Sequence, residues 1–267
     1  MLASRYFIEL TQPEIAAQLK ANPLVILPAG SVEQHGPHLP TGTDIYAARV
    51  IAHAVAERMD GLVLPGGPLG VTPLHMGYEG TITLTPDTYI RVVTETCAAA
   101  ATHGAKRLLI LNWHEGNIPS LAIAADALHR QSGLTVLTVQ ACYVAEEIYG
   151  KECNGLTHGG EIEALAVLAH RPGLVHLDRI DGSSDHRHGR DMDALRRTRS
   201  YQPVLTDVRS IAPTGWYGSP QRATEENGHR VIAGVADAIA RNSTEIFRQL
   251  AGVQGGVGEV RSIGGVG

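Results

Sequence analysis

Four short runs of aliphatic residues alternate along the chain with segments of helical periodicity. The runs cover residues 24–27, 62–64, 107–111 and 134–139, and all are rich in Leu, Val and Ile. Runs of this kind are typical of strands that are covered on both faces. Between the first two runs, residues 45–59 carry apolar side chains three or four positions apart, as amphipathic helices do. The alternation predicts an α/β fold: a single domain whose mainly parallel β-sheet is flanked by helices on both faces.

Helix boundaries follow from capping signals. Thr11, Pro13 and Glu14 are typical of a helix start, and Gly133 is typical of a helix end. We expect helices over residues 12–20, 45–59, 86–102, 117–130, 158–170 and 229–250. Most loops between strands and helices are then short, as they are in parallel sheets.

Two segments lack such signals. Residues 182–201 are polar, rich in Arg and Asp and without a clear period, which indicates an excursion over the surface, or a lid. Residues 251–267 are glycine-rich with little apolar content. We therefore expect one domain over residues 1–250 followed by a flexible tail.

Charge and cysteine content narrow the class of protein. The formal charge of −5, the sequence pI near 6.2 and the lack of long blocks of like charge give no support for a nucleic-acid or anionic-membrane partner. No secretory signal and no apolar run of about 20 residues is evident, so we expect a cytoplasmic protein with a small-molecule partner. Cys97 and Cys142 are expected to be buried and Cys153 to be partly exposed, none of them catalytic.

The loop after the first aliphatic run, residues 30–44, concentrates metal-ligand chemistry. Glu33 and His35 are two residues apart, so in an extended backbone their side chains leave on the same side. Asp44 lies where the next helix begins. One carboxylate, one imidazole and a second carboxylate able to bridge suit a borderline metal such as Zn²⁺ or Mn²⁺, or a pair of such ions. The alternative is a polar loop in which Asp44 only caps the helix.

Two further clusters are predicted to face the same edge of the sheet. Residues 112–117, Asn-Trp-His-Glu-Gly-Asn, follow the third run, and residues 158–163, His-Gly-Gly-Glu-Ile-Glu, open a helix. Ligands of parallel sheets bind beyond the carboxyl ends of the strands. We therefore expect both clusters to gather with the loop of residues 30–44.

Motifs for other hydrolytic mechanisms are missing from the sequence. It has no Gly-x-Ser-x-Gly nucleophile element, no well-placed Cys/His pair and no Gly-x-x-x-x-Gly-Lys phosphate loop. Two divalent ions can lower the pKa of a bridging water and polarise a carbonyl, so that no side-chain nucleophile is needed. The missing motifs thus agree with a metal site and give no support for covalent or nucleotide-hydrolysing catalysis.

Together these motifs resemble the creatininase (creatinine amidohydrolase) family. The resemblance rests on Glu-Gln-His-Gly-Pro-His-Leu-Pro at residues 33–40, on Asp44, and on residues 80–84, 112–117 and 158–163, in order and at fitting spacing. It implies a parallel α/β fold and a cyclic homo-oligomer, commonly a hexamer. It also implies two divalent metal ions as cofactors, Zn²⁺ and/or Mn²⁺, with Fe²⁺ as a further option.

The resemblance also implies which residues hold the metal ions. Glu33, Asp44 and His114 would hold one ion. His35, Asp44 and a further glutamate would hold the other, with Asp44 as the bridge.

The sequence departs from creatininase at two places. Creatininase has an aromatic residue and then a glutamate directly after the histidine that matches His114, whereas this chain has Glu115 and Gly116. The glutamate of the second site is then expected to be Glu163, with Glu115 as the second choice. A tryptophan of creatininase is replaced here by Asn154, which removes the stacking wall for creatinine.

Other residues near these motifs are candidates for catalysis and substrate binding. As the non-ligand imidazole of the site, His158 is expected to protonate the leaving nitrogen, with bracing of its helix as the alternative. If Glu115 is not a ligand, it would meet a cationic or N–H-rich substrate. The substrate-binding candidates are His75, Glu79, Trp113 and Asn117, and packing is an alternative role for Trp113.

Three further sets of residues receive supporting roles. His38 is expected to brace the loop through hydrogen bonds. Glu161 should face solvent or a subunit contact instead of a metal ion. The arginines between residues 187 and 199 are expected to form a solvated face, with an anion-recognising lid as the alternative.

The expected function is that of a metal-dependent amidohydrolase of the creatininase type. It would cleave a C–N bond of a small, cyclic amide through a metal-bridging hydroxide. Within the same family, a formamide deformylase and a mycofactocin-type peptidase are alternatives. An alternative from another class is a non-catalytic, metal-bound oligomeric scaffold.

Overall fold

A parallel sheet lies at the centre of the molecule. The computed structural model describes residues 2–67, 69–180, 187–198, 200–201 and 204–254. Within this part of the chain the sheet has four strands, β1 (Leu24–Ala29), β2 (Leu62–Val63), β3 (Arg107–Asn112) and β4 (Thr135–Gln140). All neighbouring pairs are parallel and the order is β2-β1-β3-β4. The predicted α/β fold is therefore confirmed.

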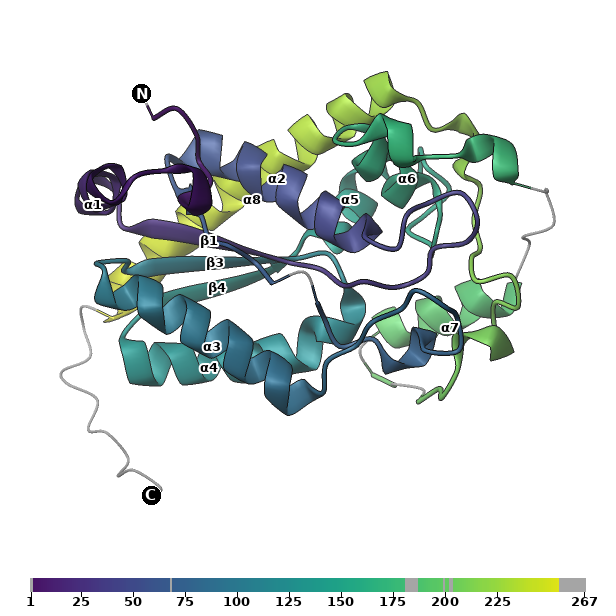
Figure 1. The fold of residues 1–267 in the computed structure, drawn as a ribbon, viewed down its shortest axis with the longest axis horizontal. Helices are drawn as coiled ribbons and strands as arrows, with labels where there is room; N and C mark the ends of the chain where they lie inside the picture. Colours follow the sequence, from purple (N-terminus) through teal and green to yellow (C-terminus); the bar gives the residue numbers. More distant parts are fainter. Residues whose placement is uncertain (1, 68, 181–186, 199, 202–203, 255–267) are drawn as a thin grey trace.

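Helices cover both faces of the sheet. The α-helices of the described residues are α1 (Gln12–Ala21), α2 (Thr43–Met59), α3 (Pro86–Thr102), α4 (Ile118–Ser132), α5 (Ala141–Tyr149), α6 (Glu161–Leu168), α7 (Arg187–Arg197) and α8 (Glu225–Gln254). Short 3-10 helices lie at Phe7–Glu9, Pro73–His75, Glu115–Asn117, Pro172–Leu174, Leu177–Arg179, Val208–Ser210 and Pro220–Arg222. In Figure 1, α2, α5, α6 and α8 lie on one side of the sheet, and α3 and α4 lie on the other.

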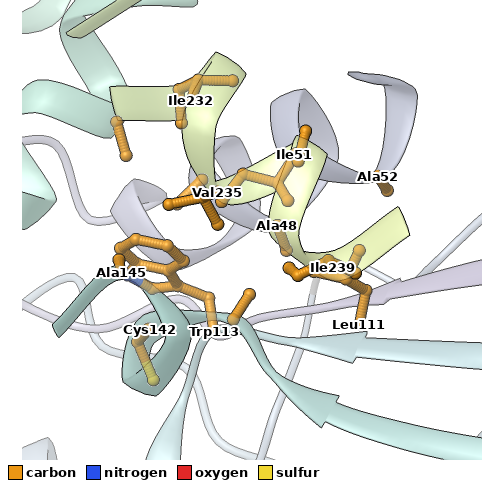
Figure 2. Packing of buried hydrophobic residues seen from close by; sticks show 14 of the residues in the cluster. Ala48, Ile51, Ala52, Leu111, Trp113, Cys142, Ala145, Ile232, Val235 and Ile239 are labelled. Atoms are coloured by element: carbon orange, nitrogen blue, oxygen red, sulfur yellow. The ribbon is translucent and has the colours of Figure 1, made fainter. Parts of the chain in front are cut away.

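Side chains of β1 alternate between two hydrophobic cores. Ile26 belongs to the core on the α2 and α8 side, whereas Val25 and Leu27 belong to the core on the α3 and α4 side. Figure 2 shows the first core, in which Ile51 of α2 and Val235 of α8 point into the same interior. Because burying such a side chain stabilises the fold by about 1.5–3 kcal/mol, both cores fix the strand in place.

The strand register brings the loop starts together. Ala29 at the end of β1 lies beside Asn112 at the end of β3, and Asn112 lies beside Gln140 at the end of β4. From β1 the chain crosses first to β2 on one side and later to β3 on the other. The loops that follow β1 and β3 therefore diverge at this edge, which is where parallel sheets bind ligands.

The structure corrects three expectations about the segments. Residues 187–197, within the supposed irregular excursion, form α7, and residues 181–186 lie outside the described part. Helix α8 begins at Glu225 and runs through Gln254, so it includes the start of the predicted tail, and the remainder of that tail lies outside the described residues. Helix α5 follows β4 directly and was not expected, because no turn signal separates the two.

The cysteines are all buried. Cys97 and Cys142 are free and buried, as predicted, but Cys153 is only 3% exposed, so the expectation of partial exposure was wrong. It belongs to the same hydrophobic core as Val231 and Val235 of α8. Among the described residues, no helix is long and apolar enough to cross a membrane.

Candidate metal centre

Five side chains from the predicted motifs meet in a buried cluster beyond the ends of β1 and β3. Glu33 and His35 come from the loop after β1, Asp44 from the first turn of α2, His114 from the residues after β3, and Glu163 from the first turn of α6. None of the five is more than 7% exposed. The clusters that the sequence placed on one edge of the sheet are therefore in contact.

Asp44 lies at the centre of this cluster, and each of its oxygens faces a different imidazole. Its Oδ1 is 3.3 Å from Nε2 of His35, and its Oδ2 is 3.2 Å from Nδ1 of His114. Glu33 completes one group, with its Oε2 3.2 Å from His114 Nδ1. Glu163 completes the other, with its Oε2 3.5 Å from His35 Nε2. The two groups, each close enough to hold one ion, share Asp44.

Main-chain groups orient both imidazoles toward the carboxylates. Nε2 of His114 donates to the Val71 carbonyl at 3.0 Å, and Nδ1 of His35 donates to the Glu33 carbonyl at 3.1 Å. The other nitrogen of each ring is thereby directed into the cluster, as in metal sites whose histidines are held by outer hydrogen bonds. Nε2 of His35 is buried without a hydrogen-bond partner. This nitrogen and the carboxylate oxygens around it fit a borderline divalent metal ion.

The electrostatics of the cluster favour a cation. Burial would raise the pKa of Glu33, but the imidazoles of His114 and His75 hold that pKa well below its usual value. Burial would also lower the pKa of His35 and His114, yet the facing carboxylates raise both pKa values well above the usual value. In the metal-free chain, protons on the imidazoles thus balance the carboxylate charge. A divalent cation would supply the same balance in their place.

Three residues that sequence reasoning missed support the carboxylates. Ser31 Oγ donates to Asp44 Oδ2 at 2.6 Å, and Thr72 Oγ1 donates to Glu33 Oε2 at 2.5 Å. The Gly159 amide donates to Glu163 Oε2 at 2.6 Å. Gly159 has φ +69°, and a Cβ there would lie 2.7 Å from the Cβ of Trp216, so the position requires glycine. Ser31 and Gly159 lie within the motifs. Of these two, only the glycine could have indicated from the sequence that its position needs an unusual backbone conformation.

His158 lies against the cluster between two other imidazoles. Its ring centroid is 4.3 Å from that of His35 and 4.5 Å from that of His75. Its Nε2 donates to the Gln34 carbonyl at 2.7 Å, and its Nδ1 is 3.8 Å from Glu33 Oε1. Burial, together with the charges of His35 and His75, lowers the pKa of His158 to about 3. A neutral ring whose Nδ1 can accept a proton therefore faces the cluster, although His158 could also join Glu33 and His35 as a ligand set.

The two candidates for the further glutamate lie in different places. Glu163 reaches His35, whereas Glu115 accepts a hydrogen bond from Nε of Arg197 at 3.0 Å and belongs to none of the possible ligand groups. A Cβ at Gly116 would lie 2.4 Å from Nε2 of His114, so no side chain fits there in this loop conformation. The geometry thus favours Glu163 over Glu115 as a ligand.

A cavity of about 300 Å³ opens onto the cluster. It is lined by Glu33, Asp44, Val71, Thr72, Pro73, Leu74, His75, Trp113, His114, Glu115, Gly116, Cys142, Leu156, Thr157, His158, Glu163, Met192, Asp193, Arg197, Val204, Leu205, Val208, Ile211 and Tyr217. Trp113 borders the cavity but is only 2% exposed, and Figure 2 shows its indole within the core shared with Val235. Trp113 is therefore chiefly a packing residue.

Two predicted substrate-binding residues are placed elsewhere. Asn117 is fully buried: its Oδ1 accepts from the Val71 amide at 2.9 Å, and its Nδ2 donates to the Gly30 carbonyl at 2.9 Å and to Oδ1 of Asn112 at 3.2 Å. It ties three loops together and does not line the cavity. Glu79 is exposed and lies outside the cavity lining. Within a single chain, neither residue lies against the cavity, so their contact with substrate stays a prediction.

The supporting residues differ in outcome. His38 donates from Nε2 to the Gly159 carbonyl at 2.8 Å, which confirms its bracing role. Glu161 is outside the metal-ligand groups, as expected, but it is 6% exposed and pairs with Arg222 at 3.3 Å, so it does not face solvent. Arg197 reaches the cavity instead of forming a solvated face, and its Nη1 donates to the Leu156 carbonyl at 2.7 Å.

An α/β fold with buried carboxylates and imidazoles gathered beyond the strand ends is the arrangement of an enzyme active site whose side chains could hold metal ions. The chain belongs to the creatininase family, whose sequence model, described as creatinine amidohydrolase, matches residues 8–242. It is accordingly an amidohydrolase, a hydrolase that acts on C–N bonds.

Two curated relatives are similar over most of the chain. The mycofactocin precursor peptide peptidase of Mycobacterium ulcerans (strain Agy99) is 30% identical over 227 residues, which cover 80% of this chain and 82% of the relative. The creatinine amidohydrolase of Pseudomonas putida is 30% identical over 263 residues, which cover 90% of this chain and 97% of the relative. Family membership thus spans enzymes that act on quite different amides.

Solved structures of creatininase share the fold. A variant described as the Zn–Zn type has a TM-score of 0.73 and 26% identity, covering 90% of this chain and 99% of the other. The manganese form has a TM-score of 0.71 and 26% identity, covering 90% and 98%. These relatives support divalent metal ions as cofactors.

Proposed function

We propose that this chain is a two-metal amidohydrolase. The observation that carries the proposal is the position of Asp44, whose two oxygens each face a different imidazole within a separate group of possible ligands. Glu33, Asp44 and His114 would hold one ion, and His35, Asp44 and Glu163 the other. Zn²⁺ and Mn²⁺ suit this mixture of nitrogen and oxygen ligands, and Fe²⁺ is a further option. When bound, such a pair of ions activates water and polarises the carbonyl of an amide.

His158 is proposed to move the proton in this reaction. Burial and the charges of His35 and His75 lower the pKa of His158 to about 3, so the ring is neutral near pH 7, and its unprotonated Nδ1 is the atom that would take the proton. The bond from Nε2 to the Gln34 carbonyl keeps Nδ1 directed at the cluster. The imidazole can then give the proton to the nitrogen that leaves. His75, which lines the cavity next to His158, is proposed to contact the substrate.

The substrate is proposed to be a small amide, with a cyclic amide as the first choice. Creatinine itself is not proposed, since Asn154 is exposed and lies outside the cavity lining. A short peptide is the second candidate. It is favoured by the 30% identity to a mycofactocin precursor peptide peptidase over 80% of the chain.

A panel of lactams, formamides and short peptides, assayed with Zn²⁺ and with Mn²⁺, tests the proposal. We expect hydrolysis of cyclic amides by protein that holds about two ions per chain. Turnover of linear peptides alone would replace the cyclic amide with the peptide. Metal-loaded protein that hydrolyses no member of the panel would contradict the amide substrate.

We also propose that the chain forms a homo-oligomer, a hexamer by resemblance, and that it is cytoplasmic. Light scattering on purified protein would measure the mass of the assembly against the 28.4 kDa of one chain. A monomeric mass at micromolar concentration would contradict the oligomer. Residues 1–250 are proposed to form the enzymatic domain, extended by the last turn of α8 through Gln254.

A further inference from the structure

The residues that line the cavity fall into two chemical groups, called here its metal-centre half and its apolar half. Carboxylates and imidazoles of the metal centre form one half. The other half is hydrocarbon: Leu74, Met192, Leu205, Val208 and Ile211 line it. Nothing in the proposed hydrolysis of the C–N bond uses this second half.

The apolar half is a packed part of the fold. Val208 is 2% exposed and forms a small hydrophobic core with Ala212 and Tyr217, against which Leu74 and Ile211 also pack. This core is separate from the two cores that flank the sheet. Leu74, Val208 and Ile211 are therefore supported from behind, so this part of the apolar lining does not depend on a bound molecule for its shape.

The charged groups that α7 brings to the cavity are engaged with protein partners. Nε of Arg197 is bonded to Glu115, and its Nη1 to the Leu156 carbonyl. Asp193 accepts a hydrogen bond from the hydroxyl of Tyr217 at 2.5 Å. These contacts hold α7 over the cavity. They leave the neighbouring aliphatic side chains as the surface on which a ligand can bury hydrocarbon.

The size of the cavity requires more than a reacting amide. A cavity needs only about 10–15 Å³ of this kind of volume to hold one water molecule, so a cavity of about 300 Å³ has room for a ligand much larger than water. A reacting amide group of a few atoms would leave part of that space empty.

We propose that the substrate carries an aliphatic or aromatic substituent next to its amide and that this substituent binds against Leu205, Met192 and Ile211. This inference rests on the proposed function, because it places the amide at the metal centre. It narrows the substrate to amides with a hydrocarbon group of several carbons. Small, fully polar amides would make no apolar contact with Leu205, Met192 and Ile211.

Binding of alkyl hydroxamates to the metal-loaded protein tests the proposal without requiring turnover. Aceto-, butano- and hexanohydroxamate carry the same metal-chelating group and differ only in chain length. Calorimetry should show the Kd falling by about fourfold for each added methylene, as expected when a chain enters an apolar site. Equal affinity for all three would overturn the apolar site and leave the two-metal amidohydrolase intact. Failure of all three to bind protein that retains its metal would overturn both.

Two leucine substitutions test where in the chain the alkyl group of the hydroxamate binds. Leu205→Asn changes a side chain that lines the cavity, whereas Leu195→Asn changes a side chain of α7 that is 36% exposed and does not line it. Leu205→Asn should flatten the dependence of Kd on chain length, while Leu195→Asn should preserve it. Met192→Gln, which keeps the volume nearly constant, should give the same flattening if Leu205→Asn fails to fold. Undiminished dependence in a folded Leu205→Asn or Met192→Gln protein would contradict the location.

Discussion

The two sides of the cavity differ in what holds their side chains in place. On the sheet side, His114 and Glu163 are bonded to main-chain groups of neighbouring loops. On the α7 side, Arg197 donates to the Leu156 carbonyl but also to Glu115, and Asp193 accepts from the Tyr217 hydroxyl, so more of the contacts join two side chains. Main-chain groups are positioned by the strands and helices themselves, whereas a pair of side chains depends on both residue identities. His114 and Glu163 are thus held by the fold, and the α7 wall depends more on individual residues.

This difference indicates how the family can act on unlike amides. The carboxylates and imidazoles arise where β1 and β3 end in register, so they change little unless the sheet changes. The opposite wall comes from α7 and from residues 204–217, which belong to no strand. Substitutions there alter shape and polarity without disturbing the sheet, as is typical of enzymes that carry specificity on peripheral segments.

The largest effect is expected from Asp44→Asn, which removes the shared carboxylate on the sheet side of the cavity. Losing the shared carboxylate should lower the metal content from about two ions per chain to one or fewer and reduce amide hydrolysis by about a thousandfold. Elemental analysis and the amide panel measure both. Asp126→Asn on α4, whose side chain is 62% exposed, is the control and should change neither. Full metal content in Asp44→Asn would contradict the bridging role.

His158→Asn separates proton transfer from metal binding on the same side. If His158 moves the proton, hydrolysis should fall by about a hundredfold to ten-thousandfold while the metal content stays unchanged. His103→Asn, at the exposed end of α3, is the matched control. A loss of one ion per chain in His158→Asn would show that this imidazole is a ligand, as the third possible group allows.

Metal affinity should weaken as the pH falls. The pKa values of His35 and His114 are raised well above the usual value in the metal-free chain, so a bound ion has to displace their protons. Lower pH favours the protonated rings, and the apparent Kd for Zn²⁺ should rise by about tenfold per pH unit for each proton displaced. Competition with a chelator between pH 6 and pH 8 measures this. A Kd independent of pH would mean that neither ring is a ligand.

The smallest effect is expected on the α7 side, from Arg197→Met. Losing the bonds to Glu115 and to the Leu156 carbonyl should lower stability by about 1–3 kcal/mol. The Tm should then fall by a few degrees, and hydrogen exchange should quicken in α7 but not in β3. Metal content should remain at about two ions. Arg248→Met breaks an exposed pair with Glu245 and should change the Tm much less. Loss of metal in Arg197→Met would show that the two sides are not independent.

Much of the sheet side could be predicted from the sequence. The aliphatic runs identified all four strands, and the spacing of Glu33, His35 and Asp44 around one loop identified a cluster that the structure brings together with His114. These predictions succeed because a parallel sheet forces the loops at one edge to meet. The contact of Glu163 with His35 followed from the family resemblance, since no spacing rule links α6 to β1.

The α7 side could not be predicted in the same way. Met192 and Leu195 are three positions apart, as on one face of a helix, but two such residues among charged ones are too few to reveal a helix. Its contacts with Glu115 arise only in the folded chain. Thr72 was missed for the same reason, because a threonine outside any motif gives no sign that it supports Glu33. The sequence also did not reveal that Glu79 is exposed and lies outside the cavity lining of a single chain.

Asn117 has a consequence for how mutational surveys of this enzyme should be interpreted. Its single amide joins the loops that begin at Gly30, Val71 and Asn112, and it touches none of the space open to a ligand. We expect its replacement to separate those loops and to abolish activity without removing any group that contacts the substrate. A survey that measures only product formation would rank this asparagine with the catalytic residues. A separate measurement of folding would distinguish a residue that holds the loops from one that takes part in the reaction.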